Sequence, residues 1–324
     1  MIPVIDFDHC RPNVQVTDAK LEETGKALVD VLSSTGFAYL TNHGISKELI
    51  ENVREAADGI FTSPSIEKQK YARDPITNCG YIGLLTEKLD DGCPYEYKEA
   101  FHVASPALDP SIGMKWPHDL SPNFAALSRT FMEKCKALSL RILELIGIGL
   151  DLKDHSVLVD CQKLMHKSGN MSGLRILYYP SIPDHSEDEI IRLGEHSDWG
   201  SITLLFQDSV GGLQVNIDEK YVDAMPVDGA LLLNVGDSLE MMSGGRIKSK
   251  KHRVLISDDE KHRKLVRRSM GYFVHPDNEV VMNQPLLYKG DPDVQEVVED
   301  PITSQQYVIK KLAAAHRSKP AASY

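Results

Sequence analysis

A histidine and an aspartate, His196 and Asp198, lie two positions apart in the stretch LGEHSDWGSITLLFQDSVGGLQV (residues 193–215). On a β-strand alternate side chains share a face, so both would point the same way while Ser197 points outward. Imidazole nitrogens and carboxylate oxygens are both metal ligands. The pair can therefore supply part of the coordination sphere of a metal ion.

The H-x-D pattern occurs a second time, at His275 and Asp277. With 12 histidines in the chain, about one such triplet is expected by chance, and a lone triplet is more often a hydrogen-bonded turn or a surface pair. The two copies differ in the residues further along the chain. The first copy is followed by His252 in the strand-like KSKKHRVLI. The second copy has a proline at its centre and is not followed by a histidine in a strand-like segment.

Two histidines and one carboxylate form the facial triad of non-haem iron(II) oxygenases, which leaves one side of the octahedron open. A structural zinc site usually has four protein ligands, and no cysteine accompanies these three residues. Further along, RRSMGYF places Arg267 and Ser269 on one face of a strand. A guanidinium can hold a carboxylate by two parallel hydrogen bonds, and the hydroxyl adds a third donor. The set therefore indicates a pocket for a dicarboxylate that also chelates iron.

The composition argues against several classes of partner. Lys and Arg number 36 against 47 Asp and Glu, and the net charge of −11 opposes attraction to nucleic-acid phosphates or anionic lipid. The five cysteines are scattered and never form C-x-x-C, which favours buried thiols in a reducing compartment. The start lacks the features of a signal peptide, and no run reaches the ~18 apolar residues of a membrane span. We predict a cytoplasmic protein with neither nucleic acid nor membrane as partner, and the oligomeric state stays open.

The first part of the chain alternates strand-like and helix-like segments. IPVIDF and GFAYLTNHGI are short β-branched and aromatic runs, and each is followed by apolar residues at helical spacing. Residues 64–120 are rich in Pro, Gly and Asp, and they contain one weak strand, YKEAFHV. Ser121 and Pro122 begin a helix with one apolar face. The pattern predicts strand, helix, strand, helix, a long irregular segment and a further helix.

From about residue 173 the spacing changes to short strands. Seven candidates are separated by Gly, Asp and Ser: LRILYYP, SITLLFQ, GGLQV, ALLLNVG, RIKS, KHRVLIS and RSMGYFV. Their density favours a jelly roll or barrel over alternating β and α units. We expect Asn234 and Gly236 to form a turn before a short helix that Asp237 or Ser238 caps. The charged stretch SDDEKHRK (257–264) is expected to extend a hairpin.

The joint pattern of HSD, KHRV and RRS, with IPVIDF and GFAYLTNHGI before it, resembles the Fe(II)- and 2-oxoglutarate-dependent dioxygenases of the isopenicillin-N-synthase-like superfamily. The resemblance extends from residue 2 to about 276. It implies a catalytic set of iron ligands: His196, Asp198 and His252. It also implies a set that binds the distal carboxylate of 2-oxoglutarate: Arg267, Ser269 and Tyr179.

Two features depart from many plant members of that family. They have an asparagine two residues before the tyrosine, where this chain has Leu177, so one polar contact to 2-oxoglutarate is missing or replaced. The interval between His252 and Arg267 is also longer. Arg263 would shorten it, but residue 265 is leucine rather than serine. We therefore assign the carboxylate to Arg267.

The resemblance implies a mainly β fold with flanking helices, in which a double-stranded β-helix, or jelly roll, carries an N-terminal α/β extension. We divide the chain into an N-terminal extension (1–120), backing helices (121–167), the core (168–278) and a C-terminal helical tail (279–324). All four parts are expected to form one catalytic unit.

The implied cofactor is Fe(II), with 2-oxoglutarate and O2 as cosubstrates, and the implied reaction hydroxylates a small organic molecule with release of succinate and CO2. Two alternatives stay open: an iron oxidase of the same scaffold that does not use 2-oxoglutarate, and a catalytically silent binding protein. Several further residues are candidates for facing the substrate or are scaffold: Tyr95, Tyr97, Phe101, His102, Trp199 and Gly200.

Overall fold

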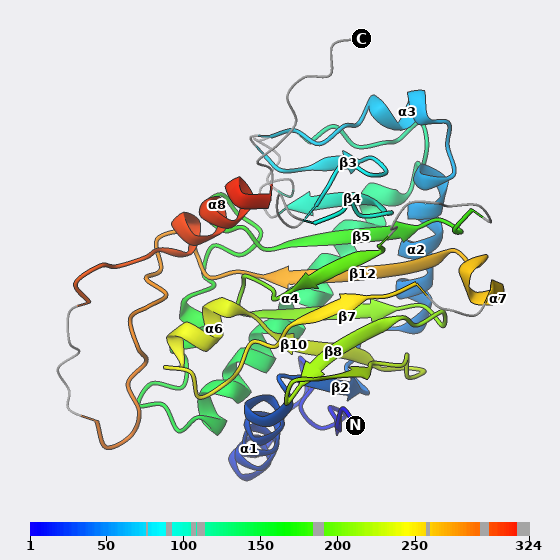
Figure 1. The fold of residues 1–324 in the computed structure, drawn as a ribbon. Helices are drawn as coiled ribbons and strands as arrows, with labels where there is room; N and C mark the ends of the chain where they lie inside the picture. The colour runs from blue at the N-terminus through cyan, green and yellow to red at the C-terminus, as the bar shows by residue number, and fades with distance from the viewer. Residues whose placement is uncertain are drawn as a thin grey trace.

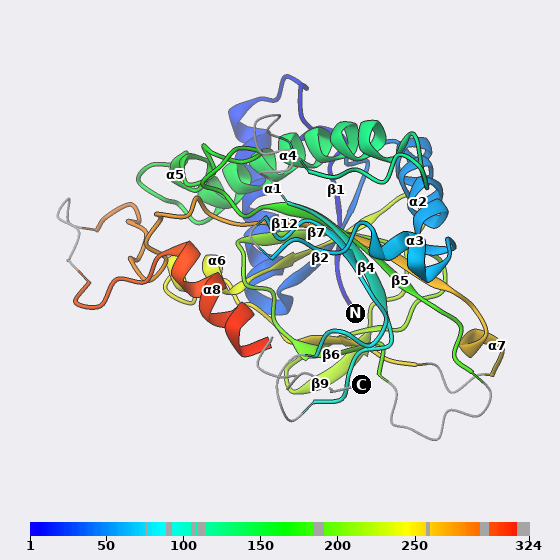
Figure 2. The same cartoon turned by 90° about the horizontal axis from the view of Figure 1, so that it is seen from above.

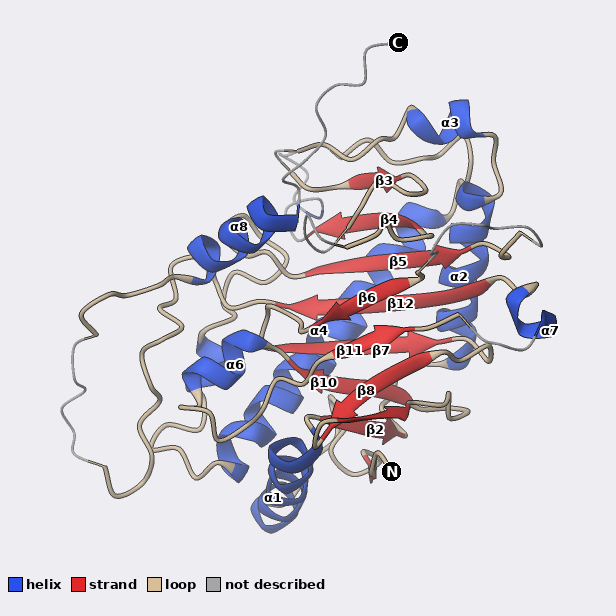
Figure 3. Cartoon of the chain, in the orientation of Figure 1, coloured by secondary structure: helices blue, strands red, loops and turns tan. Residues whose placement is uncertain are grey.

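The computed structural model describes residues 1–75, 77–88, 93–104, 108, 114–183, 191–256, 260–291 and 298–315. Its strands form a larger and a smaller sheet, with helices outside the larger one (Figures 1 and 3). Seen from above, the long helices lie on one side of the larger sheet and the smaller sheet lies on the other (Figure 2). This layering confirms the predicted mainly β fold with flanking helices.

The larger sheet has eight strands. In spatial order they are β1 (Val4–Asp6), β2 (Phe37–Thr41), β10 (Leu231–Val235), β7 (Ile202–Gln207), β12 (Arg267–Val274), β5 (Gly173–Tyr179), β4 (Glu99–Ala104) and β3 (Gly80–Ile82). β1 pairs with β2 in parallel, and the remaining neighbours are antiparallel. The first two strands of the chain therefore complete the same sheet as the strands of its second half.

The smaller sheet has four antiparallel strands. They are β6 (Leu193–His196), β11 (His252–Val254), β8 (Leu213–Ile217) and β9 (Lys220–Asp223). Its inner face packs on the larger sheet through Val215 and Val254 with Phe37 and Leu232 in one apolar cluster. The two sheets thus enclose the space between them.

The helices surround this core. They are α1 (Asp18–Thr35), α2 (Lys47–Phe61), α3 (Ser65–Gln69), α4 (Phe124–Gly149), α5 (Val157–Asp160), α6 (Asp237–Met242), α7 (Glu260–Arg263) and α8 (Ser304–Ala315). α4 crosses the outer face of the larger sheet, where Phe131 makes an edge-on contact with Phe206 of β7 at 5.0 Å between ring centroids. α1 crosses α4 so closely that a Cβ on Gly149 would lie 2.1 Å from the carbonyl oxygen of Gly25. No helix in the described ranges is long and apolar enough to cross a membrane.

The predicted order of strand, helix, strand, helix is confirmed by β1, α1, β2 and α2, and the weak strand YKEAFHV is β4. Six of the seven later strand candidates are strands, and the strand predicted for RIKS (246–249) is wrong. There the backbone N–H of Ile247 bonds to Ser243 Oγ, and that of Ser249 bonds to Glu240 Oε2. The side chains of Glu240 in α6 and of Ser243 after it therefore accept hydrogen bonds from backbone N–H groups that would otherwise bond to the carbonyls of a neighbouring strand.

Two further expectations fail locally. The extended hairpin over 257–264 is wrong in its described part, because α7 is a single helical turn, and residues 257–259 lie outside the described ranges. The helix predicted from Ser121 begins at Phe124, because the N–H of Ser121 still bonds to the carbonyl of Pro117 in a preceding turn. Neither difference alters the sheets.

Candidate metal centre

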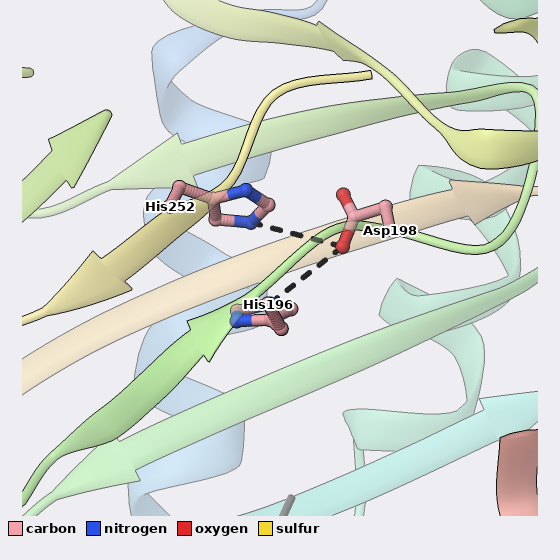
Figure 4. Close-up of side chains that lie close together, drawn as sticks. All are labelled: His196, Asp198 and His252. Atoms are coloured by element: carbon pink, nitrogen blue, oxygen red, sulfur yellow. Dashed lines mark ion pairs between the residues drawn. The ribbon is translucent and has the colours of Figure 1, made fainter. Parts of the chain in front are cut away.

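The structure brings His196, Asp198 and His252 together between the sheets (Figure 4). One ligand atom from each residue lies within 4.8 Å of the other two. Asp198 Oδ1 is 3.8 Å from His196 Nε2 and 3.7 Å from His252 Nε2. Two imidazoles and a carboxylate converging on one point can hold a divalent transition metal.

Strand pairing accounts for the meeting of residues that are distant in sequence. In the antiparallel pair β6–β11, His252 lies directly opposite His196. β6 ends at His196, so the prediction that His196 and Asp198 share one strand is wrong. Asp198 instead lies in the following turn, where its carbonyl accepts a hydrogen bond of 2.7 Å from the N–H of Asp237.

Each imidazole has its tautomer set by a backbone carbonyl. His196 Nδ1 lies 2.9 Å from the carbonyl of Gly194, and His252 Nδ1 lies 3.2 Å from that of Lys250. Because a carbonyl oxygen can only accept, Nδ1 carries the proton and Nε2 keeps the lone pair that binds a metal. Burial, followed by the neighbouring His252, lowers the pKa of His196 to about 4 and keeps this ring neutral.

The carboxylate of Asp198 is oriented by a cross-strand pair. Its Oδ2 accepts hydrogen bonds from Thr203 Oγ1 at 2.6 Å and from Asn234 Nδ2 at 2.7 Å. Thr203 of β7 and Asn234 of β10 are register partners. Burial opposes ionisation of Asp198, but the two histidines and these hydrogen bonds lower its pKa, so the group is a carboxylate whose Oδ1 faces the imidazoles.

Sequence reasoning missed both of these residues. The turn expected at Asn234 is wrong, because this residue lies within β10, and the helix α6 begins after Gly236 without a side-chain cap. Asp237 and Ser238 therefore do not cap α6: the Asp237 carboxylate accepts from Tyr307 Oη, and Ser238 Oγ donates to the carbonyl of Trp199. The available signal was a polar residue within the apolar run LLLNV, since a buried amide needs a partner.

Removing these hydrogen bonds is expected to weaken metal binding without removing a ligand. We predict that Asn234→Leu and Thr203→Val each lower the apparent affinity for Fe(II) by roughly 10- to 100-fold, because Asp198 Oδ2 loses a donor that holds the carboxylate in place. The measurement is the Fe(II) concentration that half-saturates activity. Thr130→Val, which removes an exposed hydroxyl bonded within α4, is the control. An unchanged iron requirement in both site variants would contradict the orienting role.

A cavity of about 50 Å³, here called the Arg267 cavity, adjoins the three residues. Arg267, Ser269 and Tyr179 line it together with His252 and Thr203. Arg267 is 1% exposed, and none of the carboxylates in the described part of the chain pairs with it. Its Nε donates to the carbonyl of Gly211 at 2.7 Å, and its other nitrogens donate to Ser269 Oγ and Gln207 Oε1. A buried cation held only by neutral acceptors fits an anionic ligand.

Tyr179 adds a second uncommitted group to the Arg267 cavity. Its hydroxyl lies next to Ser269, yet it makes no hydrogen bond of good geometry to the described residues. Burial raises the pKa of Tyr179, so the hydroxyl stays protonated and available as a donor. β5 and β12 pair so that Tyr179 is opposite Arg267. The residues present therefore fit a small carboxylate bound beside the metal site.

A second cavity, of about 200 Å³ and here called the Arg175 cavity, opens on the other side of the three residues. Both cavities share five lining residues: Leu177, Leu193, His196, Asp198 and Phe273. Leu177, which stands where many plant relatives have asparagine, thus makes an apolar boundary between the two spaces. His196 and Asp198 face both cavities, so a ligand in either one would lie next to the metal site.

The residues predicted either to face the substrate or to be scaffold divide into those that line the Arg175 cavity and those that do not. His102 and Trp199 line the Arg175 cavity, whereas Phe101 contacts Phe124 of α4 on the opposite side of the sheet at 5.1 Å between ring centroids. Tyr95 and Tyr97 do not line the cavity in the described structure. Gly200 is scaffold, because a Cβ there would lie 2.2 Å from the carbonyl oxygen of Val274.

The second H-x-D copy has a structural role. The Asp277 carboxylate accepts hydrogen bonds from Asn170 Nδ2 and from the N–H of Leu164. His275 lines the Arg175 cavity, and burial lowers its pKa to about 4. Asp277 is therefore committed to holding the chain between α5 and β5, as expected for a hydrogen-bonded turn.

Comparisons with known proteins agree with this geometry. The model of the 2OG-Fe(II) oxygenase superfamily matches residues 170–276, and that of the N-terminal region of non-haem dioxygenases in morphine synthesis matches residues 2–124. The 2-oxoglutarate-Fe(II) type oxidoreductase ppzD of Metarhizium majus is 34% identical over 281 residues, which cover 78% of each chain. A bifunctional coumaroyl CoA and feruloyl CoA ortho-hydroxylase of Ipomoea batatas is 29% identical, with 96% of this chain and 82% of the relative covered.

A solved structure is similar over almost the whole length. It is a full-length protein of Neurospora crassa in complex with alpha-KG and thymine, with 28% sequence identity and a TM-score of 0.81. The match covers 97% of this chain and 96% of that one. Both sheets and the flanking helices therefore have counterparts in a protein that binds 2-oxoglutarate.

Proposed function

The chain belongs to the 2-oxoglutarate–Fe(II) oxygenase superfamily, and from this premise we propose which residues hold the iron and the cosubstrate and which reaction they support. Its two facing sheets are the jelly-roll core that the sequence predicted. It is a non-haem iron dioxygenase that uses Fe(II), 2-oxoglutarate and O2. The four predicted segments, 1–120, 121–167, 168–278 and 279–324, are proposed to act as one catalytic unit, since strands from the first and third share one sheet.

His196, Asp198 and His252 are the proposed iron ligands. The observation that carries this assignment is the convergence of two Nε2 atoms and one carboxylate oxygen, within 4.8 Å of one another, from two segments that are distant in the sequence. The backbone carbonyls at Gly194 and Lys250 orient the rings, and Thr203 with Asn234 orients the carboxylate. With three protein ligands, the remaining positions are available to other molecules.

Arg267, Ser269 and Tyr179 are the proposed partners of the distal carboxylate of 2-oxoglutarate. The guanidinium has no carboxylate partner in the described protein, and the tyrosine hydroxyl next to it is an uncommitted donor. A carboxylate placed between them would neutralise the buried charge and accept both donors. Leu177 lies opposite Ser269 on the neighbouring strand and helps to keep water out of the Arg267 cavity.

The proposed reaction is the oxidation, by default the hydroxylation, of a small organic molecule in the Arg175 cavity. When bound, iron with 2-oxoglutarate and O2 supplies the oxidising chemistry, with succinate and CO2 as coproducts. The protein contributes orientation and a shielded space. The relatives named above include an ortho-hydroxylase, which supports hydroxylation, and they do not single out one substrate for this chain.

The test is conversion of labelled 2-oxoglutarate to succinate by the purified protein. We expect conversion that requires Fe(II), stops when a chelator removes the metal, and accelerates with an accepted substrate. Failure to bind 2-oxoglutarate in the presence of Fe(II) would contradict the proposal. Oxygen uptake without succinate would favour the oxidase alternative, and tight 2-oxoglutarate binding without oxygen uptake would favour the silent binding protein.

A further inference from the structure

The wall of the Arg175 cavity away from the metal site is charged. It includes Glu87, Lys98 and Arg175, and all three are joined by ion pairs. Arg175 lies on β5 with Leu177 and Tyr179, and alternate residues of a strand share a face. Along this face of β5, Arg175 lines the Arg175 cavity, Leu177 forms the apolar boundary between the two cavities, and Tyr179 lines the Arg267 cavity.

The two arginines lie at separate places along the same pair of strands. In the register of β5 and β12, Tyr179 is opposite Arg267 and Arg175 is opposite Gly271. Four residues along a strand span about 14 Å. His196 and Asp198 line both cavities and so lie between the two guanidinium groups.

The guanidinium of Arg175 is only partly used by the protein. It has five N–H donors in a planar fork, and its hydrogen bond to the described residues runs from Nη2 to Glu87. Its side chain is 21% exposed and lines the cavity. Arg267, by contrast, donates from all three nitrogens. Arg175 therefore presents donors toward a molecule in the cavity, and Glu87 holds the fork in place.

Cationic side chains outnumber carboxylates in the charged part of the lining: Arg73, Lys88, Lys98 and Arg175 occur there with Glu87 and Glu96, and Lys98 pairs with Glu96 as well as Glu87. Arg175, Lys98 and Arg73 together hold the pKa of Glu87 well below its usual range, against its burial. His102 is buried beside them, and burial, followed by repulsion from Arg175 and Arg73, lowers its pKa to about 3 even though Glu87 opposes that repulsion. His102 is therefore neutral and adds no charge to this part of the cavity.

We propose that the substrate oxidised by this protein is a small organic carboxylate whose carboxylate group binds to Arg175. The proposal rests on the proposed function, because it places this molecule in the cavity beside the metal site. The cavity of about 200 Å³ is smaller than the sites of drug-sized ligands, so the substrate is compact. Leu177, Phe273 and Trp199 also line the cavity and offer apolar surface, so the body of the molecule is apolar. The oxidised carbon is then remote from the carboxylate.

Matched acids and amides test the charge requirement. The full-length protein, loaded with Fe(II) and saturating 2-oxoglutarate without oxygen, is titrated calorimetrically with benzoate, phenylacetate and cyclohexanecarboxylate and with their neutral amides. Saturating 2-oxoglutarate keeps the acids out of the Arg267 cavity. At least one acid is expected to bind on the order of 10- to 100-fold more tightly than its amide, because a charge-assisted hydrogen bond is replaced by a neutral one.

Variants of Arg175 assign the preference to this residue. Arg175→Gln is expected to remove the preference for the acid, and Arg175→Lys is expected to keep part of it, because the charge remains while the fork is lost. Both variants should bind 2-oxoglutarate as the unmodified protein does, which shows that the core is intact. Equal binding of acids and amides, binding of none of the acids, or a full preference in Arg175→Gln would overturn the inference. If the unmodified protein fails to bind 2-oxoglutarate, the proposed function itself fails.

Discussion

Replacing His252 with alanine is expected to abolish Fe(II)-dependent turnover while the fold persists. His252 supplies one of three converging ligand atoms, and the remaining histidine and aspartate would have to hold the ion alone. Removing residues that merely support a ligand already costs 10- to 100-fold in metal affinity, so losing the ligand itself should cost at least about 100-fold. The strand that carries it pairs on both sides and retains its backbone hydrogen bonds.

Anaerobic spectroscopy measures this loss directly. Fe(II) chelated by 2-oxoglutarate in such a site gives a weak visible charge-transfer band, which should be absent in His252→Ala at iron concentrations that saturate the unmodified protein. The matched control is His118→Ala, which removes an exposed imidazole far from the site in sequence. A band of unchanged intensity in His252→Ala would refute the ligand assignment.

The second large effect is expected at Arg267. Replacing it with leucine should weaken 2-oxoglutarate binding by on the order of 100-fold, because the distal carboxylate loses a buried cation and its charge-assisted hydrogen bonds. Arg267→Lys should fall between the two proteins, since a lysine keeps the charge but lacks the planar fork. Calorimetric titration with 2-oxoglutarate in the presence of Fe(II) and the absence of oxygen gives the affinities.

The adjacent residue provides a matched control for this experiment. Arg268 points to the other face of β12, where its Nε donates to Asp58 Oδ1 at 2.6 Å. Arg268→Leu removes the same chemical group from the same strand, and it is expected to leave 2-oxoglutarate affinity unchanged. If the two leucine variants bound 2-oxoglutarate equally well, Arg267 would not be its anchor.

Local pattern was enough to predict the strands that carry His252 and Arg267. KHRV and RRS each place a polar residue on a short strand, so its identity and its face can be read from the sequence, whereas HSD is only partly a strand because β6 ends at His196. Their meeting depends on the pairing of β6 with β11 and of β5 with β12. The family resemblance supplied that long-range information, because strand periodicity alone does not specify which strands are neighbours.

The features that the sequence did not reveal depend on contacts between distant segments. Thr203 and Asn234 look like ordinary strand and turn residues until the register of β7 and β10 places both on Asp198. RIKS has the composition of a strand, but the side chains of Glu240 and Ser243 satisfy its backbone donors first. The turn that presents Asp198 is likewise held by the N–H of Asp237, which lies in a separate segment of the chain.

The lining of the Arg175 cavity comes from different parts of the chain. Strands of the two sheets supply His196, Arg175 and Leu177, whereas Glu87 and Lys98 precede β4 and Val308 and Leu312 belong to α8. Substitutions in those outer segments would alter what the cavity accepts while the oxidising centre stays as it is. A protein built in this way can acquire a new substrate during evolution, or in the laboratory, without having to rebuild its chemistry.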